Sequence, residues 1–321
     1  MTATQRPIGS GFGFGFGAHS TATDVLAGSD LSGKLAVVTG GYSGLGLETT
    51  RALTAAGATV IVPARRPETA AAALAGIDGV EQDIVDLGDL DSVQTFAERV
   101  VDRGRPVDIV IDNAGIMACP ETRVGPGWEA QFATNHLGHF ALVNRLRPVL
   151  GDGTRVVSVS SMGHFRSGIR WDDVQFERGY DKWLAYGQAK TANSLFAVHL
   201  DTLGRHHGIR AFTLHPGGIR TPLQRHLPKQ DMIDMGWIDE DGNAAHPSFT
   251  TPEQGAATQV WAATSPQLDG MGGLYCEDCD IAGPAEDATR TGVKDHAVDP
   301  EQAARLWALS AELTGVDGFL N

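Results

Sequence analysis

The sequence predicts an α/β fold built on a single doubly wound parallel sheet with helices on both faces. From Lys34 onward, short apolar runs alternate with longer helical patterns. Strands that are joined through helices pair in parallel by right-handed crossovers. No linker-like break interrupts residues 31–321, and a chain of 321 residues that is 42% hydrophobic can bury a large core. We therefore expect one domain over residues 31–321.

The expected strands are short segments that alternate with longer helical patterns. The first strand, Leu35–Val38, is apolar without alternation, as in a strand that is buried on both faces. Strands are expected at residues 35–38, 58–62, 80–84, 107–111, 155–159 and 210–214. The helices between them are expected at residues 44–56, 68–75, 89–103, 128–150 and 182–206. Gly57 ends the first helix, and cap residues followed by proline start two more, at Thr251-Pro252 and Asp299-Pro300.

The N-terminus and one internal segment are less regular. Residues 1–30 are expected to form an arm, with a short helix at residues 21–26 that Gly28 ends. The glycine- and phenylalanine-rich run of this arm is costly to order, which favours a flexible lead-in. The alternative is that Phe12, Phe14 and Phe16 dock on a neighbouring surface. Residues 222–250 lack clear periodicity and are expected to form a substrate lid.

Composition excludes several classes of function. Acidic residues number 39 against 25 basic ones, and the net charge of −14 disfavours nucleic-acid partners. No apolar run approaches the length of a membrane span, and the N-terminus lacks the order of a signal peptide. Three cysteines are too few for a disulfide scaffold, which indicates a reducing compartment. We expect a soluble, cytoplasmic protein with no nucleic-acid partner and no membrane span.

No metal site is expected. Cys276 and Cys279 have the spacing of half a zinc site, but no second ligand pair accompanies them. His136 and His139 stand at i and i+3 in a helical stretch. They are expected to pack or to form hydrogen bonds rather than to bind a metal.

A glycine-rich turn from Thr39 to Gly46 joins the first strand to the first helix. Glycine permits a tight turn and lets the backbone approach a pyrophosphate, while free N–H groups at the helix start supply positive potential. The position after a buried first strand favours dinucleotide binding over an ordinary glycine-rich turn. The residues of this turn that we expect to bind the cofactor are Gly40, Tyr42, Ser43, Gly44, Leu45 and Gly46.

The spacing Thr-Gly-x3-Gly-x-Gly in this turn resembles that of the short-chain dehydrogenase/reductase family, and further motifs follow in the family's order. They are Asp86-Leu87 after the third strand, Asn113-Ala114-Gly115 after the fourth, Asn135 in NHLGHF, Ser160-Ser161 at the end of the fifth, Tyr186 to Lys190 as YxxxK, and Pro216-Gly217 after the sixth. The match spans about residues 31–315. NHLGHF, YDKWLAYGQAKTAN and LWALSAELTG look closest to the retinol-dehydrogenase-like branch. The chain departs from the family at Asp112, where asparagine is commoner, and in its long N-terminal arm.

The resemblance implies a Rossmann-type fold and a nicotinamide cofactor. It implies that the pair after the third strand holds the adenine ring and that the turn after the sixth strand approaches the nicotinamide. Thr221 would bond the nicotinamide carboxamide; the alternative is a simple helix N-cap before Pro222. The residues that the resemblance assigns to this cofactor are Asp86, Leu87, Asn113, Ala114, Gly115, Tyr186, Lys190, Pro216, Gly217, Ile219 and Thr221.

The end of the second strand indicates which nicotinamide cofactor is used. An acid there accepts hydrogen bonds from the ribose 2′-OH of NAD, whereas a 2′-phosphate prefers a guanidinium. This chain has Arg65 and Arg66 in TVIVPARRP and no acid. We expect NADP(H), held by a charge-assisted grip of Arg65 and Arg66, with NAD(H) as the second choice. The alternative is a solvated arginine pair in a loop.

Hydride transfer between a carbonyl and an alcohol requires a general acid/base and a donor to the carbonyl oxygen. Tyr186 and Lys190 lie four residues apart in a helical stretch and therefore share one face. Lys190 can lower the pKa of the Tyr186 phenol through its charge, and by resemblance it also holds the nicotinamide ribose. Ser161, after a parallel strand, would donate to the substrate oxygen, with Ser160 as the second candidate. By resemblance, Asn135 fixes a water that links Lys190 to solvent and completes a tetrad.

Two segments, residues 162–185 and 222–250, are expected to shape the substrate site. Their apolar and sulfur-containing side chains suit a bulky hydrophobic alcohol, ketone or aldehyde. These side chains are Met162, His164, Phe165, Trp183, Met232, Met235 and Trp237. The resemblance transfers no particular substrate, because retinoid-like, steroid-like, terpenoid and polyketide carbonyls would all satisfy these residues.

The expected function is that of an NADP(H)-dependent oxidoreductase that interconverts a ketone or aldehyde and an alcohol. The alternative is a non-catalytic NADP(H)-binding sensor with the same fold, although every position of the tetrad is filled here. A sugar-nucleotide epimerase is disfavoured, because that branch has a different glycine turn and a longer C-terminal domain. Family members commonly associate through the long helices that hold Asn135 and Tyr186, so a homo-oligomer is expected.

Overall fold

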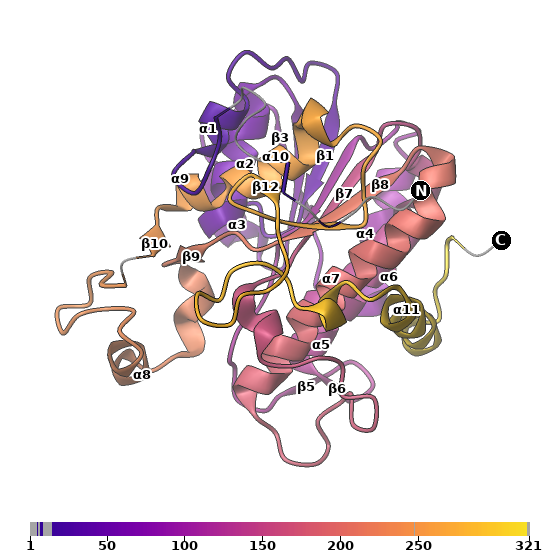
Figure 1. Ribbon diagram of the computed structural model, residues 1–321. Coiled ribbons are helices and arrows are strands. Elements are labelled where there is room, and N and C mark those ends of the chain that lie inside the picture. Colours follow the sequence, from indigo (N-terminus) through magenta and orange to yellow (C-terminus); the bar gives the residue numbers. More distant parts are fainter. Residues whose placement is uncertain (1–4, 6, 9–14, 247, 320–321) are drawn as a thin grey trace.

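A computed structural model of the chain describes residues 5, 7–8, 15–246 and 248–319 (Figure 1). Its centre is an eight-stranded sheet in the order β12-β11-β8-β7-β4-β1-β2-β3. The strands are β1 (Leu35–Val38), β2 (Thr59–Ala64), β3 (Val80–Ile84), β4 (Ile109–Asp112), β7 (Arg155–Val159), β8 (Arg210–Leu214), β11 (Leu274–Glu277) and β12 (Asp280–Ile281). Neighbours pair in parallel except β11 and β12, which are antiparallel. The predicted doubly wound parallel sheet is confirmed, with an antiparallel strand added at one edge.

Helices cover both faces of this sheet (Figure 1). They are α1 (Ala22–Val25), α2 (Gly44–Ala55), α3 (Pro67–Leu74), α4 (Leu90–Val101), α5 (Ala130–Phe132), α6 (Gly138–Leu146), α7 (Lys182–Gly204), α8 (Lys229–Asp234), α9 (Pro252–Gly255), α10 (Ala257–Thr264) and α11 (Pro300–Thr314). The side chains of β1 alternate between two cores: Ala36 and Val38 pack with α2 and α10, and Leu35 and Val37 pack with α4, α6 and α7. A strand between two cores has no polar face, which explains its unbroken apolar sequence. Within the described ranges, none of the helices is long and apolar enough to cross a membrane.

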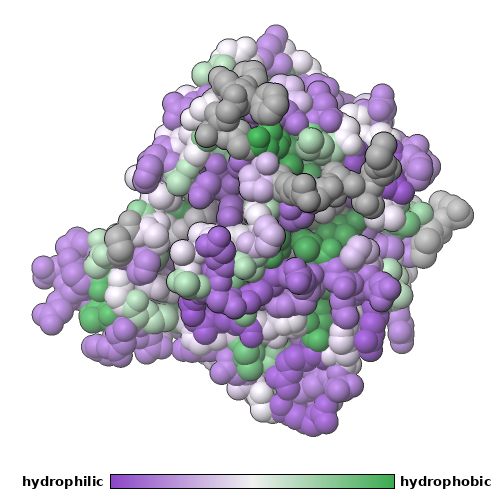
Figure 2. Space-filling model, in the orientation of Figure 1, coloured by the Kyte–Doolittle hydropathy of each residue, from purple (hydrophilic) through white to green (hydrophobic). Residues whose placement is uncertain are grey.

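The outer surface agrees with the acidic composition. The face shown in Figure 2 is largely hydrophilic, with smaller apolar areas near its centre and on the projecting segment that carries α8. The chain has a net charge of −14, so a hydrophilic exterior of this kind is what its charged residues lead one to expect.

Strands β11 and β12 were not expected. They form a hairpin around Cys276 and Cys279, and its turn holds Asp278 and Cys279 with φ of 51° and 57°. Both thiols are buried. In the part of the chain that the structure describes, no group of three or more histidine, cysteine or carboxylate side chains is arranged to hold a metal ion. The two-cysteine spacing therefore belongs to a tight hairpin turn.

The prediction of one continuous helix over residues 128–150 is wrong. Trp128–Glu129 form strand β6, which pairs with β5 (Arg123–Val124). Helix α5 then passes into a π-helical segment, Ala133–Leu137, before α6 begins, and a 3₁₀ turn follows α6. A π turn holds one residue more than an α turn, so it changes the direction of the side chains inside it. Asn135 lies in this segment, and apolar periodicity could not distinguish the π turn from an α-helix.

The N-terminal arm packs on the chain's own surface at several described positions. The Gln5 amide bonds the backbone of Tyr275 and Ala282 at the edge of β11. Ile8 and Phe16 pack against the core beneath α2 and α10. The short helix expected at residues 21–26 is present as α1, and Thr21 is its N-cap rather than its first residue. Phe16 is thus docked within the chain, whereas Phe12 and Phe14 lie outside the described residues.

The lid segment, residues 222–250, contains short elements. A 3₁₀ turn at Pro222–His226 and helix α8 are followed by β10 (Phe249–Thr250), which pairs with β9 (Gly218–Ile219). Helix α8 projects to one side of the sheet beside β9 and β10 (Figure 1). An ion pair of 3.1 Å between Lys182 and Asp231 joins α8 to the start of α7. Elements this short show no apolar periodicity, so sequence analysis could not detect them.

Helix α11 packs against α7 on the side of the sheet that carries α6. Trp307 of α11 stacks on Phe196, with ring centroids 5.8 Å apart, and meets Phe140 edge-on at 4.8 Å. His136 bonds Ser310 of α11 at 2.7 Å, in agreement with the packing role expected for it. The homo-oligomer expected through α6 and α7 stays a prediction, and α11 covers part of that surface.

Candidate active site

Tyr186 and Lys190 lie one turn apart on α7 and both are buried, with 5% and 4% of their surface exposed. Asp181 caps the start of this helix by accepting from the N–H groups of Trp183 and Leu184, both at 2.8 Å. The Lys190 ammonium donates to the carbonyl of Val159 at 2.8 Å and lies 5.7 Å from the centre of the Tyr186 ring. The ammonium is thus held beside the phenol at the carboxyl end of β7.

Ser161 is the serine that reaches Tyr186. It follows β7, its side chain lies close enough to the Tyr186 hydroxyl to lower the pKa of that phenol, and it accepts from the N–H of Gly163 at 3.0 Å. Any Cβ on Gly163 would lie 2.9 Å from the Tyr186 ring, so a glycine is required for this approach. The second candidate, Ser160, instead donates to the carbonyl of Lys190 at 2.7 Å and accepts from Ser194. Ser160 therefore anchors α7 and does not face the phenol.

Asn135 is fully buried in the π-helical segment. Its amide oxygen accepts from the N–H of Ile116 and its amide nitrogen donates to the Ile116 carbonyl, both at 2.9 Å. A Cβ on Gly115 would lie 3.2 Å from the Asn135 oxygen and 3.8 Å from the Lys190 nitrogen. Asn135 therefore pins the turn that follows β4 beside Lys190, so the tetrad residues converge at one edge of the sheet.

Burial controls the protonation of this group. Burial raises the pKa of Tyr186 to about 12, and the hydrogen bond from Ser161 opposes that rise. Burial lowers the pKa of Lys190 to about 7. At neutral pH the phenol therefore carries its proton, while the ammonium is close to the midpoint of its titration. A small change in the charge around Lys190 changes its protonation and, through it, the stability of a Tyr186 phenolate.

Two histidines hold the Ser161 segment: His164, which sequence analysis expected to line the substrate site, and His215, which it did not single out. His164 is fully buried; its Nε2 accepts from the N–H of Lys294, so its Nδ1 carries the proton and donates to the Ser161 carbonyl at 2.7 Å. His215, after β8, accepts from the N–H of Met162 at 3.3 Å. Burial lowers the pKa of each to about 4, so both are neutral at pH 7. His164 thus faces Tyr275 and the segment near Lys294, and the substrate-lining role expected for it stays without support.

The glycine turn has the predicted position between β1 and α2. Gly40 and Gly44 have φ of 66° and 52°, and a Cβ on Gly46 would overlap the carbonyl oxygen of Gly40. Ser43 makes no side-chain capping bond among the described residues, so the first N–H groups of α2 remain available to an anion. A Cβ on Gly44 would lie 3.2 Å from Thr221, which places the turn against the start of the lid segment.

Hydrogen bonds join this turn to the catalytic edge. The Thr39 hydroxyl accepts from the N–H groups of Asn113 and Ala114, both at 3.0 Å, and the Asn113 amide donates to the Thr39 carbonyl. His139 bonds Thr39 through Nε2 and donates from Nδ1 to the carbonyl of Asn135, both at 2.9 Å. Burial lowers the pKa of His139 to about 4. This neutral histidine therefore connects the glycine turn to the π-helical segment.

The remaining predicted cofactor residues lie along the same edge of the sheet. Asp86 accepts from the N–H of Gly88 at 3.0 Å. Gly138 packs so closely against Leu87 that a Cβ on this glycine would overlap the Leu87 carbonyl oxygen. Pro216 and Gly217 follow β8, and Ile219 lies in β9. The Thr221 hydroxyl accepts from the N–H of Leu223 at 3.2 Å, so the N-cap that was its alternative role is confirmed.

Arg65 and Arg66 follow β2 and are exposed. The Arg65 guanidinium lies 4.0 Å from the nearest Asp86 oxygen, at the limit of an ion pair. The guanidinium of Arg66 has no ion-pair partner among the described residues. An exposed Arg65 with one long ion pair, an unpaired Arg66, an uncapped helix start and a glycine turn with no room for a Cβ on Gly46 together fit a phosphorylated dinucleotide.

Apolar side chains from the lid segment, from the turn after β4 and from the start of α7 gather around Tyr186, and we call them the apolar cluster. Its members are Met117, Ala118, Trp183, Leu223, Leu227, Met232, Met235 and Trp237. Trp183 and Trp237 meet edge-on with ring centroids 6.0 Å apart. The lid residues predicted to line a substrate site thus lie beside the phenol, and they favour an apolar substrate.

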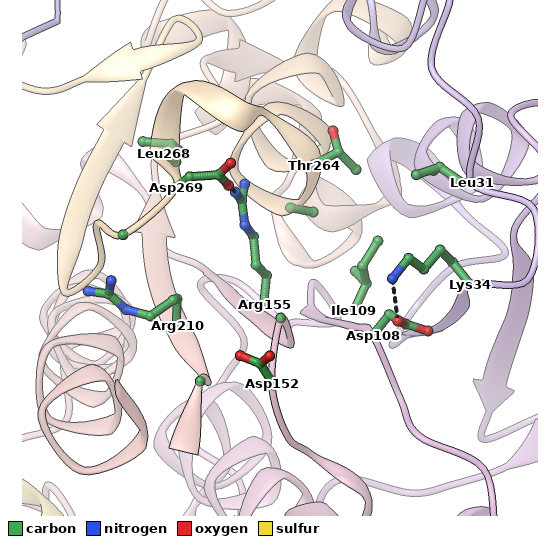
Figure 3. Close-up of a pocket in the computed structure, with 14 residues that line it drawn as sticks. Leu31, Lys34, Asp108, Ile109, Asp152, Arg155, Arg210, Thr264, Leu268 and Asp269 are labelled. Atoms are coloured by element: carbon green, nitrogen blue, oxygen red, sulfur yellow. Dashed lines mark hydrogen bonds and ion pairs between the residues drawn. The ribbon is translucent and has the colours of Figure 1, made fainter. Parts of the chain in front are cut away.

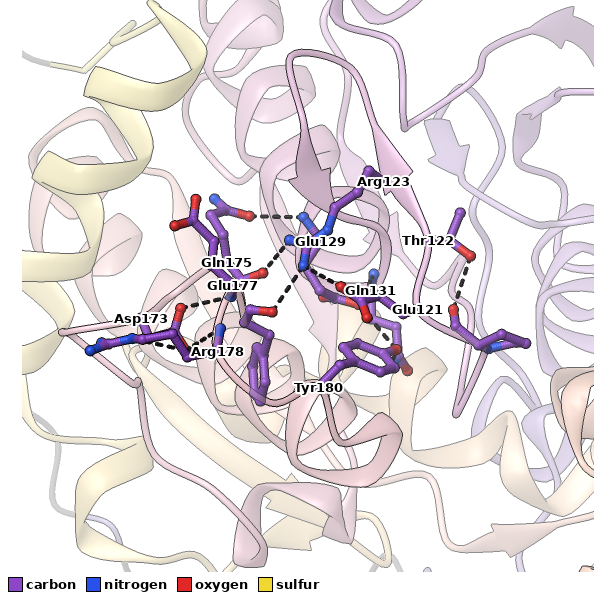
Figure 4. A network of polar contacts seen from close by, with 12 residues as sticks. Glu121, Thr122, Arg123, Glu129, Gln131, Asp173, Gln175, Glu177, Arg178 and Tyr180 are labelled. Carbon is purple, nitrogen blue, oxygen red and sulfur yellow. Dashed lines mark hydrogen bonds and ion pairs between the residues drawn. The ribbon is translucent and has the colours of Figure 1, made fainter.

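A polar network fastens one wall of this cluster (Figure 4). Gln131 accepts from the N–H of Ala118 at 2.8 Å and donates to the Tyr180 hydroxyl and to the Lys182 carbonyl. Tyr180 donates in turn to the carbonyl of Cys119 at 2.9 Å. The buried Glu129 carboxylate caps α5 and accepts from the N–H of Gln131. These residues lie far apart in the sequence and form no local motif, so sequence analysis missed them.

A cavity of about 450 Å³ lies at the opposite edge of the sheet, at the amino ends of β4, β7 and β8 (Figure 3). Two ion pairs line it: Lys34 with Asp108 at 2.8 Å, and Arg155 with Asp269 at 2.7 Å. Ligands of doubly wound sheets bind at the carboxyl ends of the strands. This cavity is therefore separate from the catalytic edge.

Asp112, the residue at which the sequence departs from the family pattern, ends β4 with a fully buried side chain. Its carboxyl oxygens have no hydrogen-bond partner among the described residues. Burial raises the pKa of this carboxyl well above its usual range. Asp112 is therefore buried in its neutral, protonated form.

Asp112→Asn is expected to stabilise the fold, and the gain should grow as the pH rises above about 4. The unfolded chain loses the Asp112 proton near the ordinary pKa while the folded chain keeps it, so the unfolded chain binds fewer protons. Wild-type stability then falls by about 1.4 kcal/mol per pH unit until the folded pKa is reached. Asparagine does not titrate and removes this slope. Urea unfolding at about pH 5 and about pH 7.5 measures the gain, and a variant no more stable than wild type at the higher pH would contradict this account.

Comparisons with known proteins cover most of the chain. A family model described as short chain dehydrogenase matches residues 34–232. A protein of Streptomyces lividans named "Probable oxidoreductase" is 47% identical over 295 residues, covering 88% of this chain and 98% of that protein. Retinol dehydrogenase 12 of Homo sapiens is 34% identical over 294 residues, covering 89% and 88%. The solved structure of an uncharacterized protein from Mycobacterium paratuberculosis has a TM-score of 0.73 and 35% identity, covering 94% of this chain and 100% of that one.

Proposed function

The chain belongs to the short-chain dehydrogenase/reductase family of oxidoreductases, near its retinol-dehydrogenase-like branch, and on this premise we propose that it interconverts a bulky hydrophobic ketone or aldehyde and the corresponding alcohol with NADP(H). The observation that carries the proposal is the buried pair Tyr186 and Lys190 with the partly exposed Ser161 beside the phenol, at the sheet edge that also carries the glycine turn. The apolar cluster around Tyr186 supports a hydrophobic substrate. The family uses nicotinamide dinucleotides, and its fold presents them at the carboxyl ends of the strands.

The proposed chemistry assigns one task to each side chain. A bound nicotinamide supplies or accepts the hydride. In the direction of reduction, the Tyr186 hydroxyl donates its proton to the substrate oxygen, and the Ser161 hydroxyl donates a hydrogen bond to the same oxygen. The Lys190 ammonium stabilises the phenolate that remains on Tyr186. Oxidation of an alcohol uses the same groups in reverse, with the phenolate accepting the proton.

Arg65 and Arg66 support the choice of NADP(H). Both follow β2, where the adenosine ribose of a dinucleotide binds in this fold, and both are exposed and available. A guanidinium can bind a phosphate through two parallel hydrogen bonds. A carboxylate at this position would repel the 2′-phosphate, and the sequence has none there.

Arg65→Asp is expected to lower kcat/KM for NADPH by about 10- to 100-fold, because a charge-assisted bond is lost and a repulsion is added. The value for NADH should change little. Steady-state kinetics with both cofactors measure the effect. Arg51→Asp is the matched control, since Arg51 is also exposed but pairs with Glu48 on α2. Equal or better efficiency of the wild-type protein with NADH would overturn the assignment.

A non-catalytic NADP(H) sensor is the competing function. Such a protein would bind the cofactor without consuming it in the presence of any substrate. A panel of bulky ketones and aldehydes, followed by NADPH fluorescence, separates the two functions. Consumption that depends on both the carbonyl and Tyr186 supports the enzyme, and tight NADPH binding without turnover over a broad panel supports the sensor.

The location and assembly of the protein are also proposals. The three cysteines Cys119, Cys276 and Cys279 are free and buried, which agrees with a reducing compartment such as the cytoplasm. Self-association through α6 and α7 would have to use the surface that α11 leaves uncovered. Sedimentation equilibrium of the full chain distinguishes a monomer from the expected homo-oligomer.

A further inference from the structure

A third arginine joins Arg65 and Arg66 at the rim of the cofactor site. Arg225 lies in the 3₁₀ turn at the start of the lid segment, and its guanidinium donates to the Pro222 carbonyl of its own turn at 3.1 Å. Burial lowers the pKa of Arg225, and the positive charges of Arg65 and Arg66 lower it further. In a chain with a net charge of −14, guanidinium groups from two distant segments thus repel one another at one place.

One carboxylate, that of Asp86, lies at the edge of ion-pair distance from one of these three arginines. The ion pairs of the described residues include none for Arg66 or Arg225, and Arg65 reaches Asp86 only at 4.0 Å. Unpaired cations of this kind favour a ligand with more than one negative charge. A phosphate monoester carries such a charge at neutral pH.

The turn that carries Arg225 is fastened to the cofactor edge. Thr221 caps it and lies against Gly44 of the glycine turn, where a Cβ would come within 3.2 Å of Thr221. Gln224 donates to the carbonyl of Ile219 at 2.8 Å. Arg225 therefore cannot move far from the glycine turn without breaking this capping arrangement.

The same turn also reaches the substrate side. Leu223 and Leu227, two residues before and after Arg225, belong to the apolar cluster around Tyr186. A charge that binds Arg225 thus acts on the segment that packs over the catalytic phenol.

We propose that Arg225 is a third ligand of the ribose 2′-phosphate of NADP(H), supplied by the lid segment, and that this contact fixes the lid over Tyr186. The inference rests on the NADP(H) preference proposed above and adds a specificity residue from a different part of the chain. It makes the 2′-phosphate a bridge between the end of β2 and the lid. NADPH, but not NADH, would then order the apolar cluster.

The test compares Arg225→Gln with Arg220→Gln, a control in the same segment whose guanidinium bonds the Gly242 carbonyl. Calorimetric titration gives the Kd for NADPH, for NADH and for adenosine 2′,5′-bisphosphate. Arg225→Gln is expected to raise the Kd for NADPH and for the bisphosphate by at least about tenfold, with NADH nearly unchanged. Hydrogen exchange should show the lid protected by NADPH more than by NADH in the wild type, and equally in the variant.

Other results of these binding measurements would overturn the inference. An equal loss for NADPH and NADH would assign Arg225 to the pyrophosphate and overturn the inference. Unchanged Kd values for all three ligands would overturn it as well, while the NADP(H) preference stands if the wild type still binds NADPH more tightly. A wild-type protein that binds NADH as tightly as NADPH would overturn both the proposed preference and the inference.

Discussion

Tyr186→Phe is expected to lower kcat by about 10²- to 10⁴-fold while the fold and the Kd for NADPH are kept. The substitution removes the hydroxyl that donates the proton and leaves the buried ring in place. Burial raises the pKa of this phenol to about 12, so the wild-type group is protonated and ready to donate at neutral pH. Stopped-flow measurement of NADPH consumption with a hydrophobic ketone gives the rate, and calorimetry gives the Kd.

Tyr275→Phe is the matched control for this variant. Tyr275 is a buried tyrosine in β11 whose hydroxyl contacts Nδ1 of His164 at 3.3 Å. The Tyr275→Phe variant also loses a phenolic oxygen, and its turnover is expected to stay close to that of the wild type. Retained turnover in Tyr186→Phe would refute the acid/base role, and an equal loss in both variants would indicate structural damage instead.

Lys190→Met is expected to lower kcat/KM by at least about 10²-fold and to shift the pH profile of alcohol oxidation upward. Without the ammonium, the Tyr186 phenolate forms only at higher pH, so the rising limb of the oxidation profile moves to higher pH. Reduction should be less sensitive to pH, because it starts from the protonated phenol. Profiles in both directions measure the shift; an unshifted oxidation profile would contradict the role of Lys190.

The same variant has a stability readout. Burial lowers the pKa of Lys190 to about 7, below its ordinary value of 10.5. Between these values the unfolded chain binds more protons than the folded one, so wild-type stability rises with pH by up to about 1.4 kcal/mol per unit. Methionine removes this slope and should make the unliganded protein more stable at pH 7. Urea unfolding at about pH 7 and about pH 9 tests this, and a variant that keeps the wild-type slope would show that Lys190 is not its source.

The central strands and the catalytic helix could be predicted because local patterns determine them. Strands β1, β7 and β8 have the predicted bounds, since each carries apolar residues that pack into two cores. The edge strand β3 also has its predicted bounds, although it is largely polar and partly exposed. The four-residue spacing of Tyr186 and Lys190 needs only helical geometry to bring them together. The glycine turn was also predictable from the local sequence. A Cβ on Gly46 would overlap the carbonyl oxygen of Gly40, so only glycine fits there.

Other features depend on contacts between distant segments. The π-helical segment around Asn135 has the same apolar pattern as an α-helix, and its hydrogen bonds to Ile116 appear only in the fold. The choice of Ser161 over Ser160 depends on Ser160 bonding the backbone of Lys190. Arg225 lies in a segment without periodicity, and the positive charges that lower its pKa, those of Arg65 and Arg66, follow β2. No sequence pattern within a single helix or strand could have predicted these three features.

Transfer of deuterium tests the central claim most directly. NADPH carrying deuterium at C4 of the nicotinamide is incubated with the protein and a bulky hydrophobic ketone, and the alcohol is analysed by mass spectrometry. The proposed chemistry predicts an alcohol with one deuterium on the carbinol carbon in the wild type and hardly any product in Tyr186→Phe. A protein that binds the labelled cofactor tightly yet yields no labelled alcohol from any ketone or aldehyde of a broad panel would contradict it.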